Sequence, residues 1–237
     1  MAPLLKVDNI EVYYGMIKAL KGVSFEVNKG EIVALIGANG MGKTTLVRAI
    51  SKLNSVKSGK IFFKGEDITD LSADKIVEKG IIQVPEGRKL FPQMSVIENI
   101  EMGAYAKRAR AKEKENLEYV FGVFPELKTM LKQACGNLSG GQQQMVAIAR
   151  SIMASPELLI LDEPSIGLSP IATQKMFDAI ELINKSGIGI LITEQNVQQV
   201  LRMADTAYAM QQGKIALSGK ASEIATNDEL KKIYIGM

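Results

Sequence analysis

One segment of the sequence has the residue types and the spacing of a loop that binds phosphate groups. Residues 37–44 fit the pattern G-x-x-x-x-G-K-[ST] and lie between an apolar run and a predicted helix. Glycines let the backbone curl until successive N–H groups point at phosphate oxygens, and the start of the helix adds positive potential. Lys43 would neutralise the β- and γ-phosphates of a nucleotide, and the hydroxyl of Thr44 would bind Mg²⁺. The alternative is an ordinary glycine turn that leads into a helix.

Two adjacent carboxylates follow an apolar run further along the chain. Asp162 and Glu163 come directly after residues 158–161. Because ligands bind beyond the carboxyl ends of the strands of a parallel sheet, we expect Asp162 to reach the Mg²⁺ of the same nucleotide. Glu163 would face the γ-phosphate, where a carboxylate orients or deprotonates an attacking water. Taken alone, the pair also fits an acidic helix cap before Pro164.

A third motif has the features of a second anion site. The residues before another predicted helix are Leu138, Ser139, Gly140, Gly141 and Gln142. The first N–H groups of a helix have no partner within it, and a serine followed by two glycines leaves them accessible to an anion. The alternative is a helix start that is capped by Ser139 and contains flexible glycines.

The elements around these motifs predict an α/β protein with a mostly parallel sheet. Short apolar runs, typical of strands buried on both faces, alternate with helical patterns. This alternation indicates βαβ crossovers. The predicted strands are residues 31–36, 80–85, 158–161 and 188–193, and the predicted helices are residues 43–53, 142–154 and 171–185.

Other segments depart from this alternation. The first thirty residues alternate apolar and polar positions, which predicts two or three antiparallel strands, and a further β segment is expected at residues 59–64. Residues 95–133 are charge-rich and helical, which predicts a helical subdomain. The tail predicts a hairpin from residues 205–210 and 214–218, followed by short polar helices.

The composition excludes several classes of function. The 237 residues are 46% hydrophobic and 23% charged, as in a folded protein, and the net charge is only +3, so we expect no nucleic-acid partner. The sequence has no histidine, which excludes Ser-His-Asp triads and His-ligated zinc. Its single cysteine, Cys135, allows no internal disulfide and is expected to be buried and inert. No apolar run approaches the ~18 residues of a membrane span, and we expect the chain to stay in the cytoplasm.

The order of the three motifs resembles that of the ATP-binding cassette (ABC) ATPases from near Leu4 to the C-terminus. Residues 84–92 (Val-Pro-Glu-Gly-Arg-Lys-Leu-Phe-Pro), 161–168 and 194–196 are similar to the smaller ATPase subunit of branched-chain amino acid importers. The resemblance implies an ATPase that energises the uptake of branched-chain, hydrophobic amino acids through a membrane permease.

The same resemblance implies a fold. The expected fold is a P-loop NTPase ABC core with a mostly parallel sheet and an N-terminal antiparallel β subdomain, formed by residues 1–85 and 155–237. Residues 86–154 would form an α-helical subdomain that carries the 138–142 motif. The whole chain would then be one ABC ATPase domain.

The resemblance also assigns roles to individual residues. Such cassettes work as head-to-tail pairs, and each ATP lies between the phosphate loop of one subunit and the 138–142 motif of the other. Glu163 and Gln195 are then catalytic, and Mg²⁺ binds Thr44, Asp162 and Glu86. The residues that bind ATP are Tyr14, Gly37, Ala38, Asn39, Gly40, Met41, Gly42, Lys43, Thr44 and Thr45, and those that contact the ATP of the partner are Ser139, Gly140, Gly141 and Gln142.

Some of these residues leave alternatives open or depart from the wider family. Tyr14 would stack on adenine, with Tyr13 as the neighbouring candidate and a plain strand-face aromatic as the alternative. Glu86 stands where most members have a glutamine that contacts Mg²⁺ and water, with Gln83 three residues earlier. Gln195 replaces the usual histidine near the γ-phosphate; the alternative is a polar strand-end residue. Two further departures are Ser169, in place of an aspartate, and Met41, in place of alanine or serine.

Partners follow from the resemblance as well. They are two integral-membrane permease subunits, a second and different ABC ATPase subunit and an external solute-binding protein, with this chain peripheral on the cytoplasmic face of the inner membrane. In isolation, a homodimer of this chain is the alternative to the heterodimer. A permease helix would enter a groove near residues 86–99, lined by Phe91, Met94 and Val96; alternatively, these three belong to the subdomain core. Two other functions stay open. One is the similar ATPase of urea importers, and the other is a non-transport ABC nucleotide switch, although the long coiled-coil insertions of such switches are absent.

Overall fold

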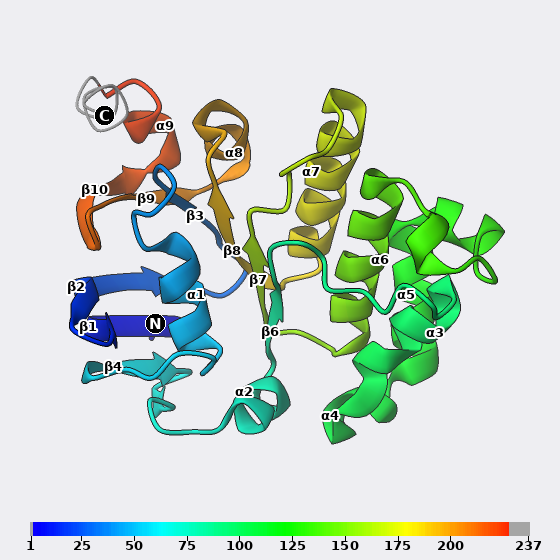
Figure 1. Cartoon of the computed structure of the whole chain (residues 1–237), viewed down its shortest axis with the longest axis horizontal. Helices are drawn as coiled ribbons and strands as arrows, with labels where there is room; N and C mark the ends of the chain where they lie inside the picture. The colour runs from blue at the N-terminus through cyan, green and yellow to red at the C-terminus, as the bar shows by residue number, and fades with distance from the viewer. Residues whose placement is uncertain (1, 228–237) are drawn as a thin grey trace.

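The computed structural model describes residues 2–227 and contains a six-stranded sheet with the strand order β10-β9-β3-β8-β7-β6 (Figure 1). The strands from β9 to β6 in this order are parallel to their neighbours, and β10 pairs antiparallel with β9 as the predicted hairpin. The bounds are β3 Ile32–Ile36, β6 Ile81–Val84, β7 Leu158–Asp162, β8 Gly189–Glu194, β9 Thr206–Gln211 and β10 Lys214–Lys220.

The central strands are apolar throughout because both of their faces are covered. Val33 and Leu35 of β3 pack into one hydrophobic cluster, whereas Ile32, Ala34 and Ile36 pack into another on the opposite face. Side chains of a strand alternate between its two faces, so a continuous apolar run buries both of them. The prediction of a mostly parallel sheet is therefore confirmed.

A second sheet is antiparallel and lies beside α1 (Figure 1). Its order is β2-β1-β4-β5, and its first two strands are those predicted from the first thirty residues. Leu5, Val7, Ile10 and Val12 of β1 are buried in the same cluster as Val33 and Leu35. The bounds are β1 Leu5–Tyr14, β2 Ile17–Val27, β4 Ser58–Phe63 and β5 Glu66–Asp67.

The remaining helices divide between the sheets and a separate helical region. Figure 1 shows α3 to α6 together on the side of the molecule away from the antiparallel sheet. The helices of this region are α3 Val96–Glu101, η1 Met102–Tyr105, α4 Lys107–Arg110, α5 Glu113–Val123, η2 Pro125–Thr129, η3 Cys135–Asn137 and α6 Gly140–Met153. The others are α1 Lys43–Ile50, α2 Ala73–Lys79, α7 Pro170–Lys185, α8 Val197–Met203 and α9 Ala221–Ile224.

Several helix ends differ from the predictions for a local reason. The helix α1 ends at Ile50 rather than at residue 53, because Lys52 has a left-handed φ of 57°. The helix α6 begins two residues earlier than predicted, because Ser139 caps it. Of the short polar helices predicted for the tail, α9 is present, and the rest of that prediction lies outside the described residues.

The parallel order brings the carboxyl ends of five strands to one edge of the sheet. Four of these strands, β3, β6, β7 and β8, lead into segments that the sequence singles out. These segments are the phosphate loop, the loop of Glu86, the pair Asp162 and Glu163, and Gln195. Within residues 2–227, no helix combines the length and the apolar character that crossing a membrane requires.

Candidate nucleotide-binding site

The loop between β3 and α1 has a backbone conformation that favours glycine at two positions. Gly40 and Gly42 have φ values of 78° and 105°, in the left-handed region that favours glycine. A Cβ atom on Gly42 would lie 3.0 Å from the Cδ2 atom of Leu20. Gly42 is also the N-cap of α1, and since it has no side chain, it leaves the first N–H groups of the helix without a cap. This start of α1 is therefore suited to binding an anion.

Lys43 begins α1 and points back into the loop. Its Nζ atom donates hydrogen bonds to the carbonyl oxygens of Gly37, at 2.7 Å, and Ala38, at 3.2 Å. The same Nζ atom lies 3.0 Å from Oε1 of Glu163, and both side chains are buried. The loop and the acidic end of β7 thus meet at one ammonium group.

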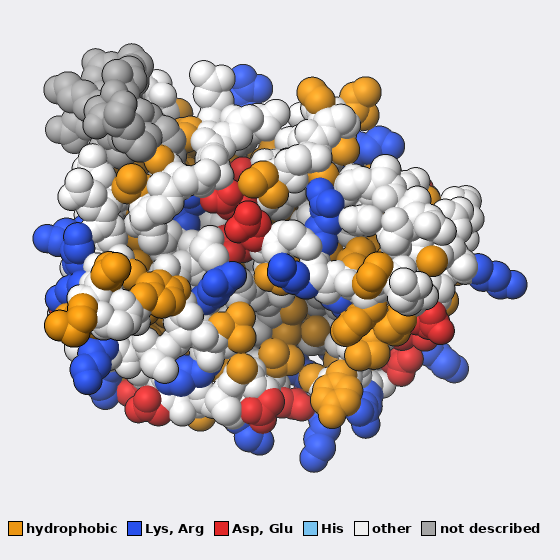
Figure 2. All heavy atoms as spheres, viewed as in Figure 1, with side chains coloured by type: hydrophobic (Ala, Val, Ile, Leu, Met, Phe, Trp, Pro, Cys, Tyr) orange, Lys and Arg blue, Asp and Glu red, His pale blue; other side chains and the backbone are white. Residues whose placement is uncertain are grey.

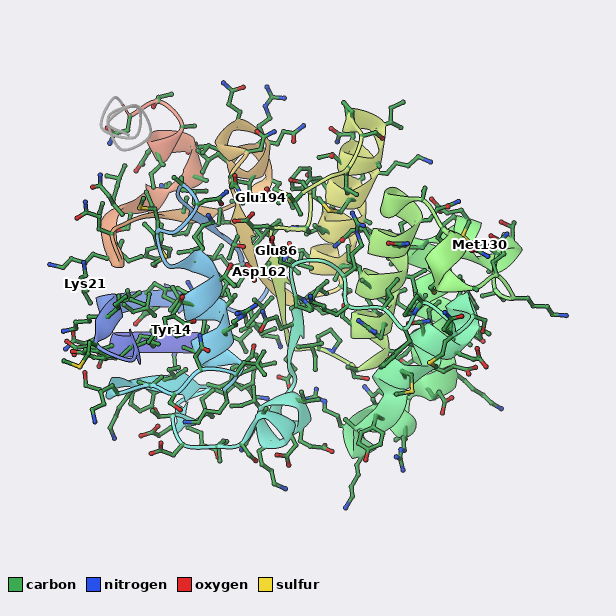
Figure 3. The ribbon with its side chains drawn as sticks, in the orientation of Figure 1. Tyr14, Lys21, Glu86, Met130, Asp162 and Glu194 are labelled. Carbon is green, nitrogen blue, oxygen red and sulfur yellow. The ribbon has the colours of Figure 1, made fainter. Side chains whose placement is uncertain are left out.

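Asp162 ends β7 and is held by two hydroxyl groups. Its Oδ1 atom accepts hydrogen bonds from Oγ1 of Thr193, at 2.8 Å, and from Oγ1 of Thr44, at 3.2 Å. Burial raises the pKa of Asp162; the two hydrogen bonds oppose this rise, and the negative charges of Glu163 and Glu86 add to it. Figure 3 labels Glu86, Asp162 and Glu194 at this edge of the sheet. The negative charges of Glu163 and Glu86 that act on Asp162 favour a nearby cation.

Glu163 is held by the neighbouring strand β8. Its N–H group donates to both the carbonyl oxygen and Oγ1 of Thr193, at 3.1 and 3.0 Å. Its Oε2 atom accepts a hydrogen bond of 2.5 Å from Nε2 of Gln195. Its φ of 47° lies in the left-handed region, which costs a non-glycine residue about 1–3 kcal/mol. The hydrogen bonds to Thr193 therefore hold the backbone of Glu163 in a strained conformation, as is common at functional sites.

Several of these residues, among them Lys43, Thr44 and Glu163, line a cleft of about 260 Å³. This volume is below the ~300 Å³ of typical ligand pockets and suits the phosphate tail rather than a whole nucleotide. In Figure 2, acidic side chains gather in a hollow at the centre of the molecule, with basic side chains beside them. The lining residues are Asn39, Gly40, Gly42, Lys43, Thr44, Thr45, Glu86, Glu163, Ile166 and Gln195.

A family model described as ABC transporter matches residues 20–166, which is more than half of the chain. The chain belongs to the ABC transporter family. The matched segment contains the phosphate loop, the 138–142 motif and the acidic pair, so the chain is an ABC ATPase and the predicted resemblance is confirmed.

Relatives and solved structures of the ABC family cover the whole chain. A high-affinity branched-chain amino acid transport ATP-binding protein of Pseudomonas aeruginosa is 41% identical over 98% of this chain and 100% of its own length. A probable branched-chain amino acid transport ATP-binding protein of Archaeoglobus fulgidus is 33% identical over 99% of both chains. The crystal structure of a nucleotide-free ATP-binding cassette from an ABC transporter matches with a TM-score of 0.87 and 30% identity over 100% of both chains. The predicted fold class is therefore confirmed.

The 138–142 motif of this ABC ATPase does not line the cleft. Instead, Ser139 caps α6: its Oγ atom accepts a hydrogen bond from the N–H group of Gln142, at 3.3 Å. In return, Oε1 of Gln142 accepts a hydrogen bond of 2.9 Å from the N–H group of Ser139. In the single chain, the motif therefore acts as the helix cap that we considered as the alternative. Its contact with the ATP of a partner subunit stays a prediction.

The two tyrosines considered for adenine differ in the contacts of their hydroxyl groups, and the stacking role stays a prediction. The hydroxyl of Tyr14 shares a hydrogen bond with Thr45 and accepts one of 2.8 Å from Nδ2 of Asn54, so its side chain lies over the start of α1. The hydroxyl of Tyr13 instead donates to Glu11. About half of the Tyr14 side chain is exposed and available to stack on a base.

Some of the other predicted residues lie where we expected them, and others do not. Glu86 lines the cleft, whereas Gln83 lines a different cavity. Val96 is completely buried in the helical core, and Phe91 is half exposed, so the groove interpretation is wrong for Val96. Cys135 is buried as predicted, and burial raises the pKa of its thiol. Ser169 caps α7.

Two positioning residues were missed by the sequence analysis. Thr193 binds both Asp162 and Glu163, and Glu194 accepts hydrogen bonds from the N–H groups of Ser165 and Gln195. Both are buried at the end of β8. A signal existed, because two polar residues directly after the apolar run of a central strand fall at the edge where ligands bind.

Proposed function

We propose that this chain is the ATP-hydrolysing subunit of an importer for branched-chain amino acids. The printed names of the relatives from P. aeruginosa and A. fulgidus support the solute class, and both relatives match nearly the whole chain. The observation that carries the ATPase role is the buried cluster of Lys43, Asp162 and Glu163 at the ends of β3 and β7.

ATP would bind with its phosphates on the loop of residues 37–45 and its adenine on Tyr14. In this structure Lys43 interacts with two loop carbonyl groups and with Glu163, which are the partners that phosphate oxygens would replace. The uncapped N–H groups at the start of α1 supply further donors. The side chain of Met41 packs on the core and its Sδ atom accepts a hydrogen bond from Gln212, so only its backbone is available to phosphate.

The residues present fit a Mg²⁺ ion. Thr44 and Glu86 line the cleft, and the hydroxyl of Thr44 lies 3.2 Å from the carboxylate of Asp162, so these residues offer hard oxygen donors of the kind that Mg²⁺ prefers. The crowding of carboxylates around Asp162 also favours a cation there. When bound, Mg²⁺ would neutralise charge on the β- and γ-phosphates.

Glu163 and Gln195 would act on the water that attacks the γ-phosphate. Gln195 donates to one oxygen of Glu163 and orients the carboxylate. Once Lys43 turns toward the phosphates, the other oxygen of Glu163 becomes available to accept a proton from water. The motif from Ser139 to Gln142 would reach the ATP of a second ABC ATPase subunit, since it lies outside the cleft of its own chain.

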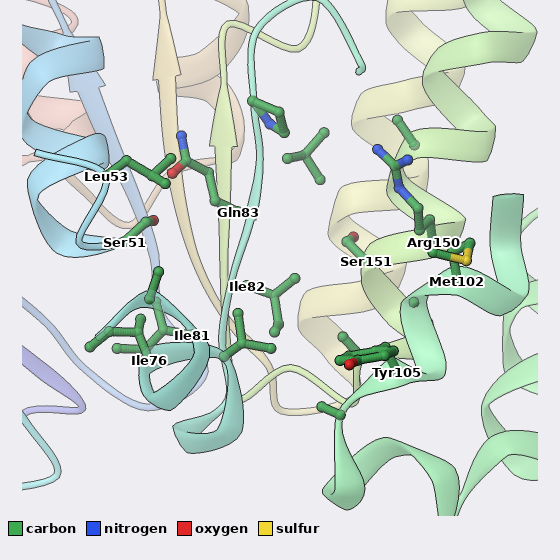
Figure 4. Close-up of a pocket in the computed structure, with 18 residues that line it drawn as sticks. Ser51, Leu53, Ile76, Ile81, Ile82, Gln83, Met102, Tyr105, Arg150 and Ser151 are labelled. Carbon is green, nitrogen blue, oxygen red and sulfur yellow. The ribbon is translucent and has the colours of Figure 1, made fainter. Parts of the chain in front are cut away.

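A cavity of about 350 Å³ supports a permease partner (Figure 4). It lies between α2, β6, η1 and α6, and its lining is mostly apolar, with Ile82, Met102 and Tyr105 among its residues. The amide of Gln83 also lines it and has no hydrogen-bond partner within residues 2–227. A short cytoplasmic helix from one of two permease subunits would cover this apolar surface.

The proposed function implies a location for the chain and a set of partners. We place the chain at the cytoplasmic face of the cell membrane as a peripheral subunit, with two permeases, a second ABC ATPase and an external solute-binding protein. The helical region within residues 86–154 would act as the subdomain that presents the 138–142 motif and part of the permease cavity.

Purification of the complex from native membranes tests the proposal. We expect integral-membrane subunits and a solute-binding protein to co-purify, and this receptor to bind leucine, isoleucine or valine rather than urea. A receptor that binds urea alone would assign the chain to the urea importers. Co-purification with ribosomes or DNA, without membrane subunits, would support the nucleotide-switch alternative.

A further inference from the structure

The loop after β6 has an unusual backbone directly beside Glu86. Gly87, Arg88 and Lys89 are all left-handed, with φ values of 74°, 64° and 48°. Arginine and lysine rarely adopt this conformation, and it persists only where surrounding contacts hold it. The contacts that hold this loop are therefore of functional interest.

Arg88 makes contacts with two segments far away in the sequence. Its Nη1 atom donates to Oε1 of Gln143, at 3.3 Å, and its Nη2 atom donates to the carbonyl oxygen of Ile166, at 3.5 Å. A Cβ atom on Gly140 would lie only 3.2 Å from Nη2. The guanidinium group thus lies between the start of α6 and the turn of residues 165–168. Among residues 2–227, no carboxylate forms an ion pair with it.

Gln143 connects Arg88 to the 138–142 motif. While its Oε1 atom accepts from Arg88, its Nε2 atom donates to the carbonyl oxygens of Leu138 and Cys135, each at 3.2 Å. A side-chain amide that donates and accepts at once is fixed in orientation. Arg88 therefore helps to set the position of the segment that ends in Ser139.

The backbone of the loop contacts a residue that lines the apolar cavity. Nη2 of Arg150 donates a hydrogen bond of 2.9 Å to the carbonyl oxygen of Arg88. Arg150 lines the cavity, as Figure 4 shows, and its guanidinium lies 5.9 Å from the ring centroid of Phe91. A continuous set of contacts runs from the cavity through Arg150 and Arg88 to Gln143 and Ile166.

We propose that Arg88 is a positioning residue that aligns the 138–142 motif and the 165–168 turn with the loop of Glu86, so that both segments can complete the ATP site of a partner subunit. The two arms of one planar guanidinium hold both segments, which a lysine cannot do with the same geometry. A partner that fills the cavity would affect the positions of the two segments through Arg150 and Arg88. This inference rests on the proposed function, because it requires two subunits to share ATP.

ATP-dependent dimerisation of the full chain tests the inference. The parent is Glu163→Gln, into which Arg88→Gln, Arg88→Lys or Lys89→Gln is introduced. Lys89 is the matched control: it is the next cation in the same left-handed loop, and its exposed side chain forms no ion pair within residues 2–227. Sedimentation measures the dimer, a fluorescent ATP analogue measures nucleotide affinity, and thermal melting reports folding.

We expect Arg88→Gln to weaken dimerisation by about tenfold, because glutamine cannot hold both segments as the guanidinium does, with nucleotide affinity and Tm close to those of the parent. Arg88→Lys should behave in the same way, and Lys89→Gln like the parent. The inference is overturned if Arg88→Lys restores dimerisation, if Arg88→Gln dimerises normally, or if its Tm and nucleotide affinity fall together with dimerisation. A parent that binds ATP but never dimerises overturns this inference for pairs of this chain, whereas the proposed ATPase role stands, because a different ABC ATPase subunit could complete the site.

Discussion

The Nζ atom of Lys43 lies 3.0 Å from Oε1 of Glu163, with both groups almost fully buried. Phosphate oxygens and this carboxylate therefore compete for the same ammonium group. If Lys43 turns to a triphosphate, as the proposed function requires, Oε1 of Glu163 loses this contact and becomes free to contact a water molecule. One contact would thus link nucleotide binding to the release of the carboxylate.

Removal of the Lys43 ammonium group should abolish tight nucleotide binding. Lys43→Ala is expected to weaken ATP affinity by at least about tenfold, because a hydrogen bond to a charged group contributes ~1.5–3 kcal/mol. Titration with a fluorescent ATP analogue measures the change, and Lys21→Ala, at an exposed position on β2, is the control. Unchanged ATP affinity in Lys43→Ala contradicts the phosphate-loop assignment.

Replacement of the Glu163 carboxylate should separate binding from hydrolysis. Glu163→Gln is expected to bind ATP but to lower kcat by about 100-fold or more, the usual contribution of a general base. The variant should accumulate as a closed dimer, because the γ-phosphate persists. Steady-state turnover and sedimentation measure both effects. Rapid turnover by this variant would remove Glu163 from the role.

Asp162→Asn should stabilise the nucleotide-free chain. Burial raises the pKa of Asp162, so the charged form is less stable in the folded state than in the unfolded state. The stability that the protonated group contributes is lost as the pH rises through the folded pKa. Asparagine keeps an oxygen for Thr44 and Thr193 but carries no charge, so we expect an increase in Tm of about 2–4 °C at pH 7, which corresponds to ~1 kcal/mol.

The pH dependence provides the control for this variant. The gain in Tm of Asp162→Asn should shrink as the pH falls, because Asp162 of the wild type becomes protonated. The same variant should lose Mg²⁺-dependent hydrolysis. A lower Tm at pH 7, or a gain that grows on acidification, would show that the carboxylate stabilises the folded chain.

Substitutions of Glu86 should act on the use of Mg²⁺. Glu86→Ala is expected to raise the Mg²⁺ concentration for half-maximal hydrolysis by about tenfold, equal to a loss of ~1.4 kcal/mol of binding. Glu86→Gln should retain more activity, since its amide oxygen still binds a hard cation. Mg²⁺ titrations of hydrolysis distinguish the variants, with Glu101→Ala, exposed on α3, as the control. An unchanged Mg²⁺ dependence in Glu86→Ala excludes Glu86 as a ligand.

Local sequence patterns were sufficient for the phosphate loop and for the acidic pair. A strand, a glycine turn and a lysine at fixed spacing determine how residues 37–44 are shaped, and the parallel sheet then brings Asp162 to the same edge. The order of elements was predictable for the same reason, since apolar runs buried on both faces differ from amphipathic helices.

The contacts that were not predicted join residues far apart in the chain. The hydrogen bonds of Thr193 depend on the register between β7 and β8, and the ion pair of Lys43 with Glu163 depends also on the register between β3 and β8. No local pattern encodes these registers. Val96 was ambiguous because an apolar residue at a helix start suits both a groove and a core, and only packing distinguishes them. The left-handed backbone of Arg88 likewise depends on tertiary contacts.

A crystal structure of the full chain with Mg²⁺ and a nonhydrolysable ATP analogue tests the central claim most directly. We expect the triphosphate on residues 37–45, with Nζ of Lys43 bonded to β- and γ-phosphate oxygens and no longer to Glu163. The 138–142 motif of a second copy should cover the γ-phosphate. A nucleotide bound elsewhere, or a cleft that keeps the ion pair of Lys43 and Glu163 at saturating nucleotide, would contradict the account.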